Sequence, residues 1–285
     1  MTPDALYLVA AEAAAERVIG VYSTSFGLAS RLLGARERRD VGNIYALVRV
    51  ADEIVDGVGT AAGLDSVAVT ARLDEYERET LRAVQSGYST DLIVHAFAAT
   101  ARRVGFGAEL IEPFFSSMRS DITQREYDEA SFAEYIYGSA EVVGLMCLHS
   151  FLEGRRMSTA QRARFDRGAR ALGAAFQKVN FLRDLAADFG ALGRSYFPGV
   201  AVESFDEATK RRLLDDLDRD LATAARVIPS LPRGSRRAVA AAHGLFAELS
   251  TRIRATPADE LVRSRTSVPS HVKAAVLIRA VIGGR

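Results

Sequence analysis

Most of this chain follows the apolar and polar spacing of amphipathic α-helices, divided by glycine and proline into helix-length segments. No strand-like alternation bounded by turn residues persists, and no internal repeat or low-complexity linker is present. The sequence therefore predicts a single all-α domain over residues 1–285. We expect helices over Asp4–Ile19, a segment ending at Leu33, Asn43–Val58, Leu64–Val84, Thr90–Val104, Ala108–Asp121, Ser131–Phe151, Ala169 through the segment that starts at Gln177, Asp206–Val227, Arg233–Ala255 and Val268–Ile282.

The stretch from Gln177 to Pro198 departs from the ordinary amphipathic pattern. A surface helix has a broad polar face and an apolar stripe, whereas this stretch has a narrow polar stripe in an apolar setting. The polar positions are Gln177, Asn180, Asp184 and Asp188, at relative positions 0, 3, 7 and 11. This spacing puts all four side chains on one face of a helix.

A second helix of the same kind is predicted over Asn43–Val58. Its polar positions are Tyr45, Arg49, Asp52 and Asp56, at relative positions 0, 4, 7 and 11, and most of the other residues are apolar. The chain thus contains two DxxxD pairs on two largely apolar helices.

These carboxylates indicate a cation site. Carboxylates one turn apart have β-carbons about 5–6 Å from each other, and burying both without a counter-charge is costly. If the two helices face each other across a cavity, four carboxylates line it, and Mg²⁺ takes one or two carboxylates together with phosphate oxygens and water. The pattern predicts a Mg²⁺–diphosphate site, with Mn²⁺ as an alternative ion. One such pair alone would more often belong to a solvated face, so the prediction depends on there being two.

Composition narrows the class of protein. With 48% hydrophobic and 26% charged residues, the chain is an ordinary globular protein. Lys and Arg number 37 against 36 Asp and Glu, so no overall charge favours nucleic acid. The single cysteine, Cys147, is expected in the core and excludes an intramolecular disulfide.

The sequence also bears on the location of the protein. We find no apolar run of the ~18–20 residues that a bilayer span needs. The N-terminal segment carries acidic residues and lacks the basic start of a signal peptide. We therefore expect a cytoplasmic protein.

The segment Ser131–Phe151 is long and apolar. Gly138 and Gly144 within it indicate close approach of another helix or room for a ligand. Glu141 lies in the same apolar setting, and we expect it to be paired with a cation rather than to bind metal or turn outward.

Several charged residues receive an ordinary structural interpretation. We expect Arg36, Arg38 and Arg39 to form a solvated basic turn before the first acidic helix. Asp121 ends a predicted helix and is interpreted as a cap or surface residue.

Two segments, YALVRVADEIVD and QKVNFLRDLAADFGALGRSYFP, resemble the signature regions of the squalene/phytoene synthase family. The resemblance extends to YIYGSAEVVG and to RTSVPSHVKAAVLIRA, and so over nearly the whole chain. It implies an isoprenoid-synthase-type helical bundle around a central apolar cavity. It also implies head-to-head condensation of two prenyl diphosphates, most like the bacterial phytoene synthases.

The resemblance implies roles for individual residues. The carboxylates Asp52, Asp56, Asp184 and Asp188 would hold Mg²⁺, with Asn180 as a further ligand. The tyrosines Tyr45, Tyr135 and Tyr196 would lie at the diphosphate-rich end of the cavity. The expected substrate-binding residues are Ser25, Arg49, Gln177, Asn180 and Arg183, with Arg265 and Lys273 as weaker candidates.

The product class has alternatives. We expect two geranylgeranyl diphosphates to give phytoene through prephytoene diphosphate, without NADPH. A squalene or dehydrosqualene synthase that uses farnesyl diphosphate is the nearest rival, and only squalene synthesis would need NADPH. Prenyl transfer to a non-isoprenoid acceptor and a non-catalytic helical scaffold are further alternatives.

Partners are less well indicated. A water-insoluble product would favour peripheral contact with a membrane surface, for which Val268–Arg285 is the candidate segment. The chain is expected to be a monomer or a homodimer.

Overall fold

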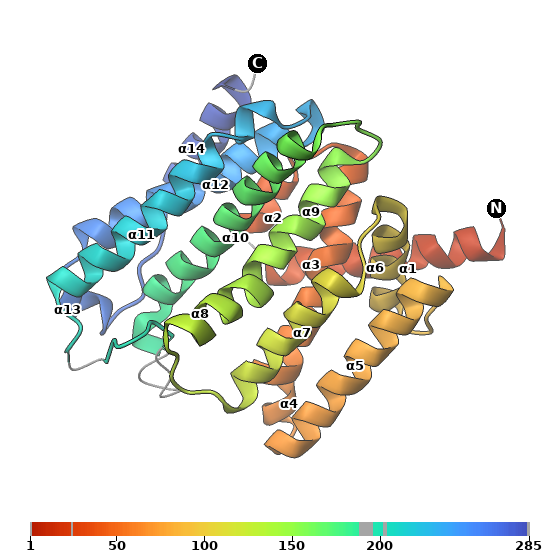
Figure 1. Cartoon of the computed structure of the whole chain (residues 1–285), viewed down its shortest axis with the longest axis horizontal. Coiled ribbons are helices and arrows are strands. Elements are labelled where there is room, and N and C mark those ends of the chain that lie inside the picture. Colours follow the sequence, from red (N-terminus) through yellow and green to blue (C-terminus); the bar gives the residue numbers. More distant parts are fainter. Residues whose placement is uncertain (1, 24, 188–195, 202–203, 284–285) are drawn as a thin grey trace.

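The helices pack side by side in two layers (Figure 1). The computed structural model describes residues 2–23, 25–187, 196–201 and 204–283. Every regular element in these ranges is a helix, which confirms the all-α prediction. The elements are α1 (Pro3–Tyr22), α2 (Ser25–Ser30), α3 (Ala35–Asp56), α4 (Val58–Ala61), α5 (Ser66–Ser86), α6 (Leu92–Val104), α7 (Ala108–Thr123), α8 (Glu129–Ile136), the π-helix η1 (Tyr137–Glu141), α9 (Val142–Leu152), α10 (Thr159–Ala187), α11 (Glu207–Ala225), the 3₁₀-helix η4 (Ile228–Ser230), α12 (Arg233–Ala255), α13 (Ala258–Leu261) and α14 (Ser270–Gly283).

One layer consists of α5, α7, the continuous α8–η1–α9 segment, α10 and α11, which lie next to one another in that order (Figure 1). Behind this layer, α3 packs against α1, α6, α7 and α9, and α12 packs against α2, α10, α11 and α14. Because α9 packs against both α3 and α10, the two predicted acidic helices share a neighbour.

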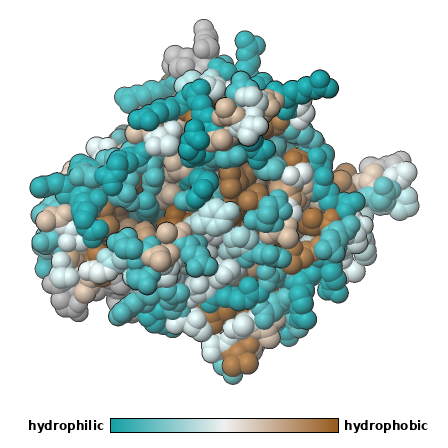
Figure 2. All heavy atoms as spheres, in the orientation of Figure 1, coloured by the Kyte–Doolittle hydropathy of each residue, from teal (hydrophilic) through white to brown (hydrophobic). Residues whose placement is uncertain are grey.

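Two large groups of buried side chains hold the layers together. One lies among α3, α5, α6, α7 and α9, and its fully buried aromatic residues are Phe97, Phe114 and Phe115. The other lies around α10 and α11, where Leu182 and Leu214 are fully buried. Hydrophilic residues cover most of the face in Figure 2, and an apolar group lies at the tip formed by α4 and the start of α5.

The first acidic helix begins earlier than the sequence predicts. Arg36, Arg38 and Arg39 belong to the first turns of α3, so the expectation of a basic turn is wrong. Ion pairs explain the difference: Arg36 pairs with Glu153, and Nε of Arg39 lies 3.7 Å from a carboxylate oxygen of Glu12.

Glycines allow the α8–η1–α9 segment to lie against both of its neighbours. A β-carbon at Gly138 would lie 2.2 Å from the carbonyl oxygen of Pro113 in α7. A β-carbon at Gly144 would lie 2.6 Å from the carbonyl oxygen of Ala169 in α10. A β-carbon at Gly173 of α10 would lie 2.5 Å from the carbonyl oxygen of Ala140. Both glycines therefore allow close helix approach, and Gly144 also lines the apolar cavity described below.

This segment also corrects the expectation that no apolar stretch is long enough to cross a bilayer. Glu129–Leu152 has the length and hydropathy of a membrane span by composition. In the structure 61% of its most apolar window is buried inside the protein, where it forms the wall between α7 and α10. A core helix of this kind passes the same compositional test.

A glycine pair tests the packing of η1. We expect Gly138→Ala to lower the free energy of unfolding by about 3 kcal/mol, because the new methyl group meets backbone atoms of α7 that cannot move aside. The matched control is Gly20→Ala in α1, where nothing lies within 4 Å of the new carbon. That variant should gain about 0.5–1 kcal/mol from helix propensity. Urea denaturation followed by circular dichroism measures both, and equal effects of the two changes would contradict the packing argument.

Candidate active site

Asp52 and Asp56, called here the acidic row of α3, continue the helix face that lines a cavity. Val41 and Val48 line the cavity wall, and Asp52 follows Val48 by one turn. The Asp52 side chain keeps 39% of its surface accessible, and Asp56, the last residue of the helix, is exposed.

The acidic row of α10, which among the described residues consists of Asn180 and Asp184, is built in the same way. Leu172 and Phe176 line the cavity, and Asn180 and Asp184 follow Phe176 at one-turn intervals. Asn180 and Asp184 are half-buried, whereas Asp188 lies outside the described residues. Both rows thus occupy the C-terminal ends of their helices. The helix dipole disfavours negative charge there, which increases the need for cations.

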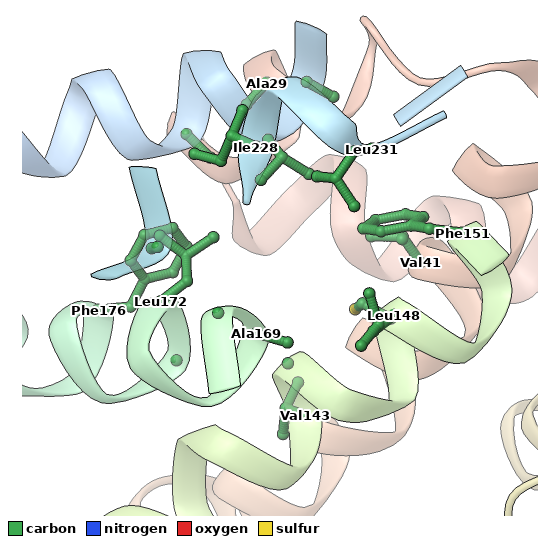
Figure 3. Close-up of a pocket in the computed structure, with 18 of the residues that line it drawn as sticks. Ala29, Val41, Val143, Leu148, Phe151, Ala169, Leu172, Phe176, Ile228 and Leu231 are labelled. Atoms are coloured by element: carbon green, nitrogen blue, oxygen red, sulfur yellow. The ribbon is translucent and has the colours of Figure 1, made fainter. Parts of the chain in front are cut away.

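The cavity itself is apolar. It has a volume of about 240 Å³ and lies between α2, α3, η1, α9, α10, α12 and the turn around Ile228. Figure 3 shows Leu148 and Phe151 of α9 directed toward the same space as Phe176 of α10 and Leu231. Among the described residues that line it, none is charged, and the polar side chains are Ser30, Ser139 and Cys147. Burial raises the pKa of the Cys147 thiol to about 12, so it is a neutral wall residue.

A cationic pocket of about 210 Å³ adjoins the row of α10. Arg183, Arg265 and Lys273 line it together, although they come from α10, the segment before α14, and α14. Nε of Arg183 and Nε of Arg265 lie 3.0 and 2.7 Å from the same carboxylate oxygen of Asp184. The fold therefore gathers three of the cations that were predicted to bind substrate.

A pair of stacked rings separates the two spaces. Phe176 lines the apolar cavity and Phe246 of α12 lines the cationic pocket. Their ring centroids are 3.8 Å apart at an interplanar angle of 19°. An anion in the cationic pocket and an apolar chain in the cavity would meet at this pair.

Arg49 compensates the row of α3. Its guanidinium pairs with Glu53, lies 3.8 Å from Asp52 and covers the ring of Tyr22 at 4.5 Å. Tyr45 stands one turn before Arg49, and burial is the main cause that raises the pKa of its phenol. The positive charge near Asp52 is therefore shared among several groups.

The electrostatic environment of Asp52 tests whether the site fits a metal ion. Desolvation by the surrounding protein raises the pKa of Asp52 to about 7, and the neighbouring Asp56 and Glu53 act in the same direction, against Arg49. The side chain nevertheless keeps 39% of its surface accessible, so the desolvation is only partial. The single guanidinium of Arg49 does not offset the negative charge of these carboxylates, whereas a divalent cation would.

The donor set agrees with Mg²⁺, which favours hard oxygen ligands. Within the described ranges, no three Asp, Glu, His or Cys side chains lie close enough to hold an ion by themselves. Asp52, Asp56, Asp184 and Asn180 would therefore hold metal together with oxygens of a diphosphate, as Mg²⁺ commonly binds.

Asp121 is not a surface cap, and the sequence-based interpretation of it is wrong. Its side chain is buried, with 3% of the residue exposed. The hydroxyl of Tyr135 donates to both of its carboxylate oxygens at 2.9 and 3.0 Å, and the hydroxyl of Tyr196 donates at 3.4 Å. The signal in the sequence is the position of Asp121 on the stripe of Phe114 and Met118, which is the buried face of α7.

Asp121 thus ties together two of the predicted catalytic tyrosines. The rings of Tyr135 and Tyr196 are 5.5 Å apart, and Tyr196 stacks on Phe181 of α10 at 3.9 Å. Desolvation and the charge of Asp121 raise the pKa of Tyr135 well above its ordinary value. The hydroxyl of Tyr135 is therefore held neutral beside α10.

The remaining predicted residues are placed as follows. Gln177 is half-buried on the polar stripe of α10, and the side chain of Ser25, at the start of α2, lies outside the described part. Glu141 is paired, as expected, with Nε of Arg170 at 2.5 Å. The catalytic, substrate-binding and metal-binding roles of the individual residues remain predictions.

Comparison with known proteins identifies the family. The model of the squalene/phytoene synthase family matches residues 19–271. The chain belongs to the squalene/phytoene synthase family. Members of this family are prenyltransferase-type enzymes.

Curated relatives cover most of the chain. It is 30% identical over 272 residues to a 15-cis-phytoene synthase of Paracoccus sp. (strain N81106 / MBIC 01143), which spans 90% of this chain and 86% of that protein. It is 30% identical over 301 residues to a phytoene synthase of Mycobacterium tuberculosis, which spans 94% and 91%.

Solved structures of the family share the fold. A dehydrosqualene synthase in complex with a ligand superposes with a TM-score of 0.79 at 23% identity, over 97% of each chain. A squalene synthase from Alicyclobacillus acidocaldarius gives 0.74 at 21% identity, over 88% of this chain and 95% of that one. These matches confirm the isoprenoid-synthase-type bundle.

The raised pKa of Asp52 predicts a pH dependence of stability. Aspartate in an unfolded chain titrates near pH ~4, so the folded protein binds this proton more tightly. The stabilisation by Asp52 is complete below about pH 4 and is lost as the pH rises through about 7. In metal-free buffer, the free energy of unfolding of the parent should therefore fall relative to Asp52→Asn over this range.

Partial exposure of the side chain keeps this effect small. Thermal unfolding of both proteins across the pH range measures it. Adding Mg²⁺ together with inorganic diphosphate at pH ~7.5 should raise the melting temperature of the parent more than that of Asp52→Asn. If the stability of the two proteins changed with pH in parallel, the raised pKa of Asp52 would be contradicted.

Proposed function

We propose that this enzyme joins two geranylgeranyl diphosphates head to head and forms phytoene through prephytoene diphosphate. The observation that carries the proposal is the junction of two polar rows with one apolar cavity. The carboxylates and guanidinium groups suit metal-bound diphosphate, and the cavity suits prenyl chains. The names of the relatives at 30% identity, both phytoene synthases, support twenty-carbon substrates.

The cationic pocket would receive the diphosphate leaving group. Breaking the allylic C–O bond leaves both bonding electrons on diphosphate and a cation on the prenyl chain. Arg183 and Arg265, already oriented by Asp184, would stabilise the charge that develops on the leaving oxygen. Lys273 adds a third positive group to the same pocket. Bound Mg²⁺ would supply further charge neutralisation of the diphosphates.

The apolar cavity would protect the cation. Its walls exclude water, which would otherwise capture the cationic carbon. The double bond of the second prenyl diphosphate attacks that carbon, and loss of a proton closes a cyclopropane ring. Loss of the second diphosphate, rearrangement and loss of one more proton then give the hydrocarbon. In this proposal the charges would separate beside the rings of Phe176 and Phe246, so the cation would face a π-system.

A fifteen-carbon substrate is the second candidate. A relative named 4,4'-diapophytoene synthase, from Staphylococcus haemolyticus, is 24% identical over 200 residues and spans 70% of this chain. Such an enzyme would use the same rows and a shorter cavity.

Product identification tests the function directly. Purified protein with Mg²⁺ is incubated with geranylgeranyl diphosphate or farnesyl diphosphate, with and without NADPH, and the hydrocarbons are identified by mass spectrometry. We expect phytoene from the longer substrate and no effect of NADPH. Asp52→Asn and Asp184→Asn should each lower kcat at least about a hundredfold, because each removes a carboxylate that would hold the Mg²⁺ that neutralises the leaving diphosphate.

The control is Asp215→Asn, which removes a surface carboxylate that pairs with Arg254. This change should leave turnover within about twofold of the parent, as surface changes usually do. Near-normal turnover of either acidic-row variant would reject the metal assignment, and hydrocarbon from farnesyl diphosphate alone would favour the second candidate.

The end of the cavity remote from the carboxylates should set the length of the chain that fits. Val41 lies there on α3 (Figure 3), about 16 Å along the helix from Asp52. We expect Val41→Phe to lower kcat/KM for geranylgeranyl diphosphate about tenfold or more, because the larger ring shortens the cavity. Farnesyl diphosphate should be accepted as well as before or better.

Competition between the two substrates measures this ratio in one reaction. Val67→Phe, at an exposed position of α5, is the matched control and should leave the ratio unchanged. An equal loss for both substrates in Val41→Phe would indicate a damaged fold instead of a shortened cavity, and melting temperatures would show which applies.

A further inference from the structure

Ser139 is an exception among the residues that line the apolar cavity. It lies in the π-helix η1, and its hydroxyl oxygen is buried without a hydrogen-bond partner in the described structure. The other serine of the cavity wall, Ser30, donates its hydroxyl to the carbonyl oxygen of Gly27 at 2.9 Å. Leaving a buried hydroxyl unsatisfied costs about 1–3 kcal/mol, so such a group calls for a physical explanation.

Two contacts fix the level of Ser139 along α10. One turn before it, the ring of Tyr135 lies 6.0 Å from that of Phe181. Immediately after it, Ala140 lies against Gly173, whose β-carbon would be 2.5 Å from the Ala140 carbonyl oxygen. Ser139 is therefore opposite the stretch of α10 between residues 173 and 181. Because Ala140 is its chain neighbour, Ser139 lies at the Gly173 end of this stretch, about one turn before Gln177, where the polar stripe begins.

The hydroxyl has freedom to turn. The residue as a whole keeps some accessible surface and lines the cavity, while its hydroxyl oxygen is buried. Rotation about χ1 moves the oxygen between staggered positions and breaks no hydrogen bond here. Side-chain rotations of this kind are fast compared with enzyme turnover.

We propose that Ser139 turns its hydroxyl into the cavity and directs its oxygen toward the cationic carbons of the reacting prenyl chain. This inference rests on the proposed function, because it requires a cation just inside the diphosphate site. The oxygen lone pairs stabilise the passing charge through a charge–dipole interaction, which is strong in a site without water. No covalent bond forms and the serine keeps its proton, so the residue stabilises the cation without ending the reaction.

Loss of this interaction should lower kcat and leave KM unchanged. Before ionisation the prenyl chain is neutral near Ser139, so the hydroxyl contributes little to substrate binding. We expect Ser139→Ala to lower kcat about tenfold, less than the loss of an oxyanion-hole donor, with KM unchanged. Ser139→Thr, which keeps a hydroxyl, should retain most of the turnover.

Stability distinguishes this role from a packing role. Because Ser139→Ala removes an unsatisfied hydroxyl, its melting temperature should equal or exceed that of the parent. The matched control is Ser250→Ala in α12, where the hydroxyl donates to Asp218 at 2.8 Å and lies outside the cavity. That variant should melt earlier and turn over at the parental rate.

Each result decides between the alternatives. An unchanged kcat in Ser139→Ala overturns the inference, as does a loss of turnover that accompanies a lower melting temperature or that Ser139→Thr fails to restore. If the parent protein itself makes no hydrocarbon from either prenyl diphosphate, the proposed function has failed, and that result is separate from those of the variants.

Discussion

The molecule depends on one electrostatic constraint, which is the placement of carboxylates at the C-terminal ends of two largely apolar helices. Helix dipoles and desolvation both oppose negative charge at such positions. The raised pKa of Asp52 is the direct sign of this opposition. The arginines beside each row relieve part of it, and α9 holds both helices at a common wall so that the rows end near one cavity.

The apolar part of the structure follows from the same two helices. Val48 and Phe176 stand one turn before Asp52 and Asn180, so each helix changes from cavity wall to polar row along a single face. The glycines of α9, η1 and α10 bring the third wall close enough to complete the enclosure. Chemistry that makes cations from diphosphates needs this abrupt boundary between a polar and a dry region.

Local patterns in the sequence were sufficient for most of the helices and for the family, because periodicity and spacing are properties of short segments. They were insufficient where partners come from distant segments. Asp121 looked like a cap because its partners, Tyr135 and Tyr196, follow 14 and 75 residues later. Arg265 was a weak candidate until the fold placed it beside Asp184. Arg36, in the first turn of α3, pairs with Glu153, whose distance along the chain hides this contact.

The two arginines on Asp184 have a consequence for how substrate is received. In the free protein, both guanidinium groups are engaged by a carboxylate of the chain itself. In the proposed function, a magnesium diphosphate would bring one ion of each sign, and Arg183 and Arg265 would bind the phosphate oxygens while Asp184 would hold the metal. Recognition would then be an exchange of counterions with little net change in charge, and the protein would be spared an exposed cluster of like charges between turnovers.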